Sequence, residues 1–500
     1  MDIRETLLEF ANSQAINSQA IMYSYMAVER LIVIMMEDYL KCQGKRLFSK
    51  NEVTHGTFNM VLLDGIDNDK SCIAAEIKMF RYKQASLGAI YNTMNHFSVR
   101  KDRFEYDKFL LIVVAELSEE IKQSIEDRRK QLEIELILWD INDLVRIFSK
   151  NEKLFAEIYN NLNTVFLKDT INNGISRNNS TYLEKRKKYV EQLQTQYEND
   201  NIVLFLGAGA SSAAKIATWN TLISELFFAL IDRQLSENNI QIEEEDKRKI
   251  VKELINQNGS SPLLQTRFLR NGFESDFEEL VREILYKNAS DSSDLLEEIG
   301  QLCIPNRGKL GVRAIVNYNF DNLIEKNLKR LRVKYHSIYG EGMVPDADEL
   351  GIYHVHGFLP QEKENYDNLA KSLLVFSEEG YHKLMLEPYN WANISQLNYM
   401  INNTCLFIGL SMTDPNMRRL LEVAAQKRTE NDGECQHYAI MKRFKIKDVD
   451  KSNSIESFER VNETLQESFF KELGVNVLWI DEFSDIPTIL KQIKGNYDSY

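Results

Sequence analysis

The stretch NIVLFLGAGAS, residues 201–211, joins a run of apolar residues to a turn in which glycine and alanine alternate. The apolar run is typical of a buried β-strand, and the turn after it opens a helix. Glycine allows a tight backbone turn and lets a phosphate approach main-chain amides at the start of a helix. A single Gly-x-Gly step fits an ordinary strand-to-helix turn equally well, so other features have to decide between the two interpretations.

Further apolar runs follow this stretch, and helical segments alternate with them. The runs are RAIVNYN, IYHVHG, TCLFIGL, HYAIM and NVLWI, at residues 313–319, 352–357, 404–410, 437–441 and 476–480. Strands that alternate with helices form a mostly parallel sheet with helices on both faces. The sequence therefore predicts an α/β fold with a Rossmann-type, doubly wound parallel sheet.

Polar residues collect just after several of these runs. Asn319 and Asp321 follow the first run, and His356 follows the second. The third run leads into a group of further polar and glycine residues, which are Gly409, Ser411, Asp414 and Asn416, and the segment LLVFSEEGY occupies residues 373–381. Doubly wound sheets bind ligands at the carboxyl edge of their strands. We therefore expect these side chains to converge on a ligand site.

Taken together and in this order, these motifs resemble the sirtuin family. The glycine loop, the Asn-Phe-Asp turn, the His-Gly step and the Gly-x-Ser strand end occur in the family's order, over roughly residues 185–495. The resemblance is greatest to the bacterial sirtuin-like proteins of anti-phage defence. Those proteins typically carry GAGAS, a tryptophan shortly after it (here Trp219), and a G-x-S-x-x-D-P-N strand end (here residues 409–416).

This resemblance implies that NAD⁺ is bound as a substrate. Asn319 would position the attacking water or the nicotinamide ribose, and Asp321 would contact the nicotinamide end. His356 would be the general base, since a neutral imidazole near pH 7 can accept a proton from water or a ribose hydroxyl. The residues implied to bind NAD⁺ are Gly207, Ala208, Gly209, Ser211, Trp219, Gly409, Ser411, Asp414 and Asn416.

These polar residues also fit purely structural roles, without ligand binding or catalysis. Asn319 fits the cap of the helix DNLIEKNL. His354 and His356 fit hydrogen-bonded histidines of a strand, and we assign His354 that role. The His-x-His pattern also fits two ligands of a metal site, but no third ligand is evident.

The sequence departs from deacylating sirtuins in three places. Those enzymes carry a four-cysteine zinc module and an arginine-bearing loop after the glycines, whereas SSAAKIATW follows the glycines here. Leu410 stands where those enzymes usually have threonine. Hydrolysis of NAD⁺ to nicotinamide and ADP-ribose is therefore favoured over deacylation. An alternative is a module that senses NAD⁺ or ADP-ribose without turnover and regulates an N-terminal nuclease.

The sequence pattern of the N-terminal part predicts a separate α/β unit. Residues 5–43 have helical spacing, and the strand-like runs FNMVLLDGI, CIAAEIKMF, FLLIVVAEL and ELILWDI begin at residues 58, 72, 109 and 135. The polar cluster NNGISRNNS indicates a boundary. We therefore expect domains at residues 1–164 and 185–500, with a linker at 165–184.

Asp64, Glu76 and Lys78 form a second candidate site. Glu76 and Lys78 lie two apart on a predicted strand, so both face the same side of the sheet. The pattern resembles the PD-(D/E)xK restriction-endonuclease superfamily, particularly its Mrr-like branch. This resemblance implies that Asp64 and Glu76 hold Mg²⁺ or Mn²⁺, that Lys78 assists the attacking water, and that DNA is a partner. Glu29 and Gln84 would support the site.

That second resemblance is less specific, and alternatives stay open. Leu63 replaces the motif proline, and Asp67 or Asp69 can substitute for Asp64 in register. A charged sheet edge fits the same residues. A DNA-sensing or partner-sensing module without cleavage also fits, with a phosphate-binding patch of Arg81, Lys83, Arg100, Lys101 and Arg103.

Charge and composition limit which other classes of protein this chain fits. The net charge of −14 argues against coating nucleic acid through bulk charge. The N-terminal residues lack an apolar signal core, and the apolar stretch at 22–36 contains Glu29 and Arg30, so we expect a cytoplasmic protein that does not span a membrane. The five cysteines form no C-x-x-C pair and no zinc ribbon. Because a toxic NAD⁺ hydrolase must be held inactive, we expect a homo-oligomer and a phage or defence-system partner protein.

Overall fold

The computed structural model describes residues 2–12, 25–49, 58–79, 87–100, 106, 108–161, 171–172, 174–175, 181–257, 262–273, 276–305, 311–372, 374–376, 380, 384–427, 436–446 and 453–495. The chain forms two compact units, which are described separately below. Unit 1 comprises Met1–Asn178, Gln426–Glu434 and Phe444–Glu472, and unit 2 comprises Asn179–Ala425, Cys435–Arg443 and Leu473–Tyr500. The two units divide between residues 178 and 179, and residues 426–434 and 444–472 group with unit 1. Most of the predicted linker lies outside the described residues.

Unit 1 contains a mixed five-stranded sheet in the order β1-β2-β3-β4-β5. The strands are β1 (Leu47–Ser49), β2 (Met60–Leu62), β3 (Ile73–Met79), β4 (Lys108–Val114) and β5 (Leu136–Trp139). Strand β2 runs antiparallel to both of its neighbours, β1 and β3, whereas β3, β4 and β5 are parallel to one another. Strand β1 was not predicted from the sequence.

Helices cover both faces of this sheet. One core joins Ile73, Ala75 and Ile77 to α1, α2, α5 and α6, and the other joins Ala74 and Phe109 to α3 and α4. The helices of unit 1 are α1 (Ile3–Asn12), α2 (Tyr25–Lys41), α3 (Leu87–Arg100), α4 (Glu119–Leu132), α5 (Ile141–Phe148), α6 (Glu152–Asn160) and α19 (Asn453–Glu472). The alternation of side chains along β3 between these two cores is what a strand buried on both faces requires.

Unit 2 is built on a seven-stranded sheet in the order β12-β11-β10-β6-β7-β9-β8. All of its strand pairs are parallel. The strands are β6 (Ile202–Leu206), β7 (Val312–Asn317), β8 (Tyr335–Ile338), β9 (Leu350–His354), β10 (Thr404–Ile408), β11 (His437–Lys442) and β12 (Val475–Ile480). The predicted doubly wound parallel sheet is confirmed, and every residue of β6 and β10 is buried, as parallel strands require.

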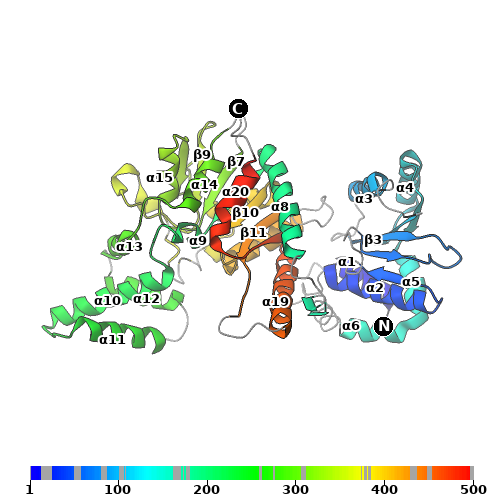
Figure 1. The fold of residues 1–500 in the computed structure, drawn as a ribbon, viewed down its shortest axis with the longest axis horizontal. Helices are drawn as coiled ribbons and strands as arrows, with labels where there is room; N and C mark the ends of the chain where they lie inside the picture. Colours follow the sequence, from blue (N-terminus) through cyan, green and yellow to red (C-terminus); the bar gives the residue numbers. More distant parts are fainter. Residues whose placement is uncertain are drawn as a thin grey trace. The chain divides into compact units, whose positions relative to one another are not determined.

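Helices pack on both faces of this sheet. Figure 1 shows α8 (Thr181–Glu198), α14 (Asp294–Leu302) and α20 (Ile486–Lys494) side by side over β10 and β11, and their apolar residues share one core with Leu204 and Ile408. The others are α9 (Ala208–Ser212), α10 (Trp219–Glu237), α11 (Glu244–Gln257), α12 (Pro262–Phe273), α13 (Phe277–Tyr286), α15 (Leu323–Arg330), α17 (Trp391–Asn402) and α18 (Pro415–Lys427).

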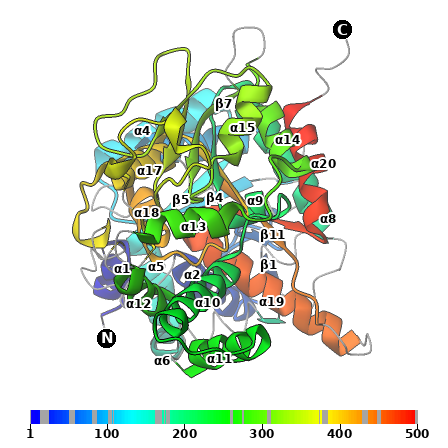
Figure 2. The same cartoon turned by 90° about the vertical axis from the view of Figure 1, so that its left-hand side faces the viewer.

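Helices α10, α11, α12 and α13 form a separate helical layer between β6 and β7 in sequence. They pack around their own apolar core, which includes Leu226, Leu269 and Val281. Figures 1 and 2 show α10, α11 and α12 together, away from the strands. The layer therefore follows directly on α9, the short helix after β6. In the described part of the chain, no helix has the length and hydropathy needed to cross a bilayer.

Candidate functional site

The carboxyl ends of four neighbouring strands of unit 2 lie in one row. Leu206 of β6 pairs with Ile408 of β10 on one side and with Asn317 of β7 on the other, and Asn317 pairs with His354 of β9. The sheet changes winding direction at β6, because the chain continues to β7 on one side and returns to β10 on the other. Ligands bind at such switch points. The residues just beyond this row therefore face one common site.

Two glycine loops meet at this switch point. The Gly207 amide donates to the Ile408 carbonyl at 3.0 Å, and the Gly209 amide donates to the Gly409 carbonyl at 2.9 Å. A Cβ on Gly209 would lie 2.7 Å from the Cα of Gly409, and a Cβ on Gly207 would lie 2.5 Å from the Leu410 side chain. These positions therefore require glycine because the two loops touch. Ala208 and Gly209 are exposed, so the loop presents main chain to solvent.

Asn319 and Ser211 lie beneath this loop. The Asn319 carboxamide donates to the Gly207 carbonyl at 3.0 Å and to the Ser211 hydroxyl at 3.2 Å. The Asn319 main-chain amide donates to the Asn317 side chain at 3.1 Å. Asn319 is 8% exposed and Ser211 is 1% exposed. Asn319 therefore joins the end of β7 to the glycine loop, and it does not cap α15, whose preceding residue is Asn322.

Asp321 is buried next to these residues. One of its carboxylate oxygens accepts a hydrogen bond from the Leu323 amide at 3.1 Å. Burial raises the pKa of Asp321 to about 6, although hydrogen bonds from Leu323 and Ser211 oppose that rise. An ionised carboxylate in this place is costly, which is typical of a side chain retained for function.

Replacing Asp321 by asparagine is expected to stabilise unit 2 at neutral pH. Because the folded-state pKa is raised from 3.8 to about 6, the wild-type protein loses stability as pH rises between these values. At 1.36 kcal/mol per pKa unit, the loss approaches about 3 kcal/mol above pH 7. Calorimetry at pH 4 and pH 7.5 should show the variant more stable than wild type only at the higher pH.

Asp348→Asn is the matched control for this experiment. Lys334 lowers the pKa of Asp348, so this exposed side chain has a pKa shift of the opposite sign. Its replacement should not raise stability at pH 7.5. An Asp321→Asn difference that is the same at both pH values would contradict the argument.

His356 lies just beyond β9 and is buried. Its imidazole Nε2 is 3.6 Å from an oxygen of Asp414, and its ring meets that of Tyr318 edge-to-face at 4.5 Å between centroids. Burial lowers the pKa of His356, while the charge of Asp414 opposes that shift. The imidazole is therefore neutral near pH 7 and able to accept a proton. The Val375 amide donates to the His356 carbonyl at 2.7 Å, while most of the predicted segment 373–381 lies outside the described residues.

Asp414 and Asn416 begin helix α18. Asp414 accepts a hydrogen bond from the Met417 amide at 2.7 Å, so its carboxylate caps this helix while facing His356. Asn416 is 1% exposed and donates to the Asn393 side chain at 2.9 Å. Asp414 is therefore brought to the site, whereas Asn416 has a buried structural contact.

Ser411 and Trp219 differ from the other predicted residues. The Ser411 hydroxyl is exposed and lies 2.6 Å from that of Thr413. Trp219 starts α10 and packs on Phe376, with 4.6 Å between ring centroids. Nothing in these contacts assigns either residue to ligand binding, so that role remains a prediction for both.

Helix α17 supplies buried amides that the sequence analysis did not select. Gln396 accepts a hydrogen bond from the Tyr318 hydroxyl, and Asn393 holds Asn416. Both amides are 1% exposed. The sequence WANISQLNYMIN contained a signal, since two of its four amide side chains, Asn393 and Gln396, share the buried face of the helix with Ala392 and Met400.

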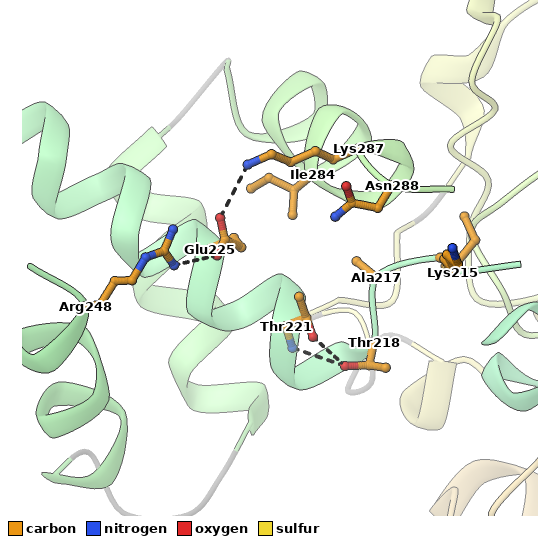
Figure 3. Close-up of a pocket in the computed structure, with 10 residues that line it drawn as sticks. Lys215, Ala217, Thr218, Thr221, Glu225, Arg248, Ile284, Lys287 and Asn288 are labelled. Carbon is orange, nitrogen blue, oxygen red and sulfur yellow. Dashed lines mark hydrogen bonds and ion pairs between the residues drawn. The ribbon is translucent and has the colours of Figure 1, made fainter. Parts of the chain in front are cut away.

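A cavity of about 310 Å³ lies next to the segment that follows α9. Figure 3 shows Arg248 and Lys287 pointing toward Glu225, which lies 3.1 Å and 3.8 Å from them. Thr218 and Thr221 bond to each other at the start of α10. None of the residues that line this cavity is among the predicted catalytic residues. The cavity therefore lies beside the segment that follows the glycine loop and α9, and it is separate from the predicted reaction site.

The predicted metal centre of unit 1 is not assembled. Antiparallel register pairs Met60 with Ala75 and Leu62 with Ile73. The chain therefore leaves β2 for Asp64 at the end that pairs with the start of β3, whereas Glu76 lies three residues further along β3. Ligands of one Mg²⁺ each lie about 2.1 Å from it. Asp64 and Glu76 therefore do not fit a shared Mg²⁺ or Mn²⁺.

The acidic residues near β2 have other partners instead. Asp64 forms an ion pair with Arg46 at 2.8 Å, which lowers the Asp64 pKa to about 2. Asp69 pairs with Lys108 at 2.7 Å. Asp67 accepts a hydrogen bond from Tyr39. Neither alternative acid therefore contacts Glu76, and the described residues contain no group of three His, Cys, Asp or Glu side chains that could hold a metal ion.

Glu76 and Lys78 do share one face of β3, as predicted. The Lys78 ammonium lies 3.6 Å from a Glu76 oxygen, and both side chains are partly buried. Glu29 lies half-buried on α2. Gln84, Arg81, Lys83, Lys101 and Arg103 lie outside the described residues, as does the side chain of Arg100.

A doubly wound parallel sheet with two glycine loops at its switch point gives unit 2 a Rossmann-like α/β architecture. The SIR2-like domain family matches residues 313–470, which include Asn319, Asp321, His356 and Gly409 but not the loop at 207–211. This finding agrees with the sirtuin-like resemblance expected from the motifs.

The chain is also similar to curated NAD(+) hydrolases. It is 23% identical over 322 residues to NAD(+) hydrolase ThsA of Enterococcus faecium, which covers 62% of this chain and 59% of that protein. It is 24% identical over 327 residues to NAD(+) hydrolase ThsA of Acinetobacter baumannii (strain 532279), with 63% and 57% covered. For NAD(+) hydrolase ThsA of Bacillus cereus (strain MSX-D12), identity is 21% over 316 residues, with 62% and 57% covered. The chain thus spans less than two thirds of the length of these relatives.

Proposed function

We propose that unit 2 hydrolyses NAD⁺ to nicotinamide and ADP-ribose. The observation that carries this proposal is the buried His356, neutral near pH 7, at the same sheet edge as Asn319, Asp321 and the glycine loop. Similarity to curated NAD(+) hydrolases supports the choice of substrate.

In this reaction the bond between the nicotinamide nitrogen and the ribose C1′ breaks, and the electron pair leaves with neutral nicotinamide. The C1′ carbon becomes oxocarbenium-like, and a water oxygen bonds to it. His356 accepts the proton that the water releases. Asn319 orients the water or the ribose through its carboxamide oxygen, and the exposed Ala208 and Gly209 let the pyrophosphate approach the start of α9 closely. Asp321 contacts the nicotinamide end.

Product analysis tests this proposal. Purified protein incubated with NAD⁺ should release nicotinamide and ADP-ribose in equal amounts, while an acetyl-lysine peptide added to the mixture stays acetylated. Stoichiometric NAD⁺ binding without products would instead favour the sensing alternative. Peptide deacetylation that depends on NAD⁺ would favour a deacylase.

For unit 1 we propose a sensing role, with DNA or a protein as its partner, rather than metal-dependent cleavage. The strand register that separates Asp64 from Glu76 favours this choice. In anti-phage defence, which the motif resemblance implies, such a unit and self-association would control when NAD⁺ is consumed.

Addition of Mg²⁺ or Mn²⁺ is expected to produce no cleavage of plasmid DNA by the full chain. Electrophoresis of supercoiled plasmid over several hours measures this, and Glu76→Gln serves as the matched variant because it keeps the side-chain shape. Cleavage that needs the metal and disappears in Glu76→Gln would contradict the sensing role. A gel-shift assay with the same DNA then separates a DNA partner from a protein partner.

A further inference from the structure

The pair formed by His354 and Glu325 is the most deeply buried ionisable group near the site. The side chains of His354 and Glu325 are 0% and 1% exposed, so neither can touch a substrate. The His354 Nε2 atom lies 2.6 Å from the Glu325 Oε1 atom. The same oxygen accepts a hydrogen bond from the Ser337 hydroxyl at 2.9 Å. One carboxylate oxygen thus joins α15, β9 and β8.

The other ring nitrogen of His354 faces the catalytic turn. His354 Nδ1 lies 3.4 Å from the main-chain carbonyl oxygen of Asn319. Asn319 in turn holds the glycine loop through its carboxamide. His354 is also two residues before His356 in the chain. One imidazole therefore ties together the two segments that carry Asn319 and His356.

The two contacts fix the orientation of the His354 ring. A carbonyl oxygen only accepts, so Nδ1 must carry a hydrogen to bond with the Asn319 carbonyl. Glu325 and Ser337 hold the Nε2 edge of the ring, and this turns the Nδ1 edge toward Asn319. Glu325 thus orients His354 from behind, as a second carboxylate or carbonyl does for a metal-bound histidine.

We propose that His354 and Glu325 are positioning residues for NAD⁺ hydrolysis, which set the Asn319 turn relative to His356. This inference rests on the proposed function and assigns His354 a role beyond the purely structural one expected from sequence. A misplacement of a catalytic group by about 1 Å can cost on the order of a hundredfold in rate, so loss of the Nδ1 contact should lower kcat rather than raise KM.

Two substitutions at His354 separate positioning from simple structural support. In His354→Asn the amide nitrogen is bonded to Cγ and stands close to the place of Nδ1, so the Asn319 contact can persist. In His354→Gln the amide nitrogen stands close to the place of Nε2, so the Glu325 contact can persist while the Asn319 contact is lost. We expect kcat to fall about ten- to a hundredfold in His354→Gln and much less in His354→Asn, with KM within about threefold of wild type in both.

His437→Gln is the control for a buried histidine of the same sheet. His437 is 2% exposed and accepts a hydrogen bond from the Cys405 amide at 3.1 Å, on β11 and outside the site. Its variant should lose thermal stability without losing kcat. Equal kcat losses in both His354 variants that track their stability losses would overturn the positioning role, as would wild-type kcat in a folded His354→Gln protein.

Crystal structures of the two His354 variants keep this test separate from that of the proposed function. Failure of the wild-type protein to hydrolyse NAD⁺ would refute the proposed function alone. The structures would then still decide the positioning role: it predicts that the Asn319 turn moves in His354→Gln and stays in His354→Asn. An unmoved turn in both variants would overturn it.

Discussion

Replacing His356 by alanine is expected to reduce the rate of nicotinamide release by about a hundred- to ten-thousandfold, the range for loss of a general base. The buried imidazole is neutral near pH 7, so it can take the proton of the attacking water. Alanine cannot accept a proton. Nicotinamide release measured by chromatography at pH 7.5, with thermal unfolding recorded in parallel, checks this expectation.

His336→Ala is the matched control, because His336 lies on β8 of the same sheet, is partly exposed and pairs with Glu349 at 3.5 Å. It should retain wild-type turnover. Since burial lowers the His356 pKa, wild-type activity should decline at a lower pH than the usual histidine pKa would give, where the imidazole becomes protonated. A folded His356→Ala protein with wild-type turnover would show that another group acts as the base.

Replacing Gly409 by alanine is expected to close the space that the two glycine loops share. The φ angle of Gly409 is +68°, and an added Cβ would lie 2.6 Å from the carbonyl carbon of Gly209 and against the Ala210 amide. The positive φ costs about 1–2 kcal/mol for alanine, and overpacking against a fixed backbone adds about 1–3 kcal/mol. The loops must separate, so NAD⁺ affinity should fall about tenfold or more, equivalent to about 1.4 kcal/mol of binding energy.

Gly342→Ala isolates the cost of the backbone conformation. Gly342 has a φ of +81°, and an added Cβ would meet nothing within 4 Å. We expect this variant to lose about 1–2 kcal/mol of stability and no NAD⁺ affinity. Isothermal titration of both variants makes the comparison. If the two glycine variants bind NAD⁺ equally well, contact between the loops is not what requires Gly409.

The sheet of unit 2 was predictable because its strands are buried on both faces. Ile202–Leu206 and Thr404–Ile408 are continuous apolar runs, and each ends in a glycine-bearing loop. Asn319 and Asp321 follow the run that forms β7, and His356 follows the run that forms β9, so a parallel sheet places them at one edge. That edge follows from parallel pairing alone, without knowledge of the strand order.

Other strands and helices of unit 2 were harder to predict from the sequence pattern. Strand β8, Tyr335–Ile338, contains a histidine and a serine within four residues, so it lacks an apolar run. Its Ser337 instead satisfies Glu325, a long-range contact that no local pattern reveals. Asn393 and Gln396 belong to α17 and reach the site only through the folded packing of that helix.

The candidate metal centre shows that the spacing of residues along the chain does not establish that their side chains meet in the fold. Asp64 and Glu76 have the spacing of a known motif, but an antiparallel pair brings residues together by register rather than by distance along the chain. The register of Met60 with Ala75 directs the chain beyond β2 toward the start of β3 and not toward Glu76, and Arg46 binds Asp64 there.

The most direct test of the central claim is the initial rate of nicotinamide release from NAD⁺ by the purified full chain, measured with and without DNA and Mg²⁺. We expect turnover that yields one ADP-ribose per nicotinamide, that disappears in His356→Ala, and that does not require Mg²⁺. A rate that rises only when DNA is present would identify unit 1 as its DNA sensor. Intact NAD⁺ under every condition, with the protein folded and NAD⁺ tightly bound, would contradict hydrolysis and leave unit 2 as a binding module.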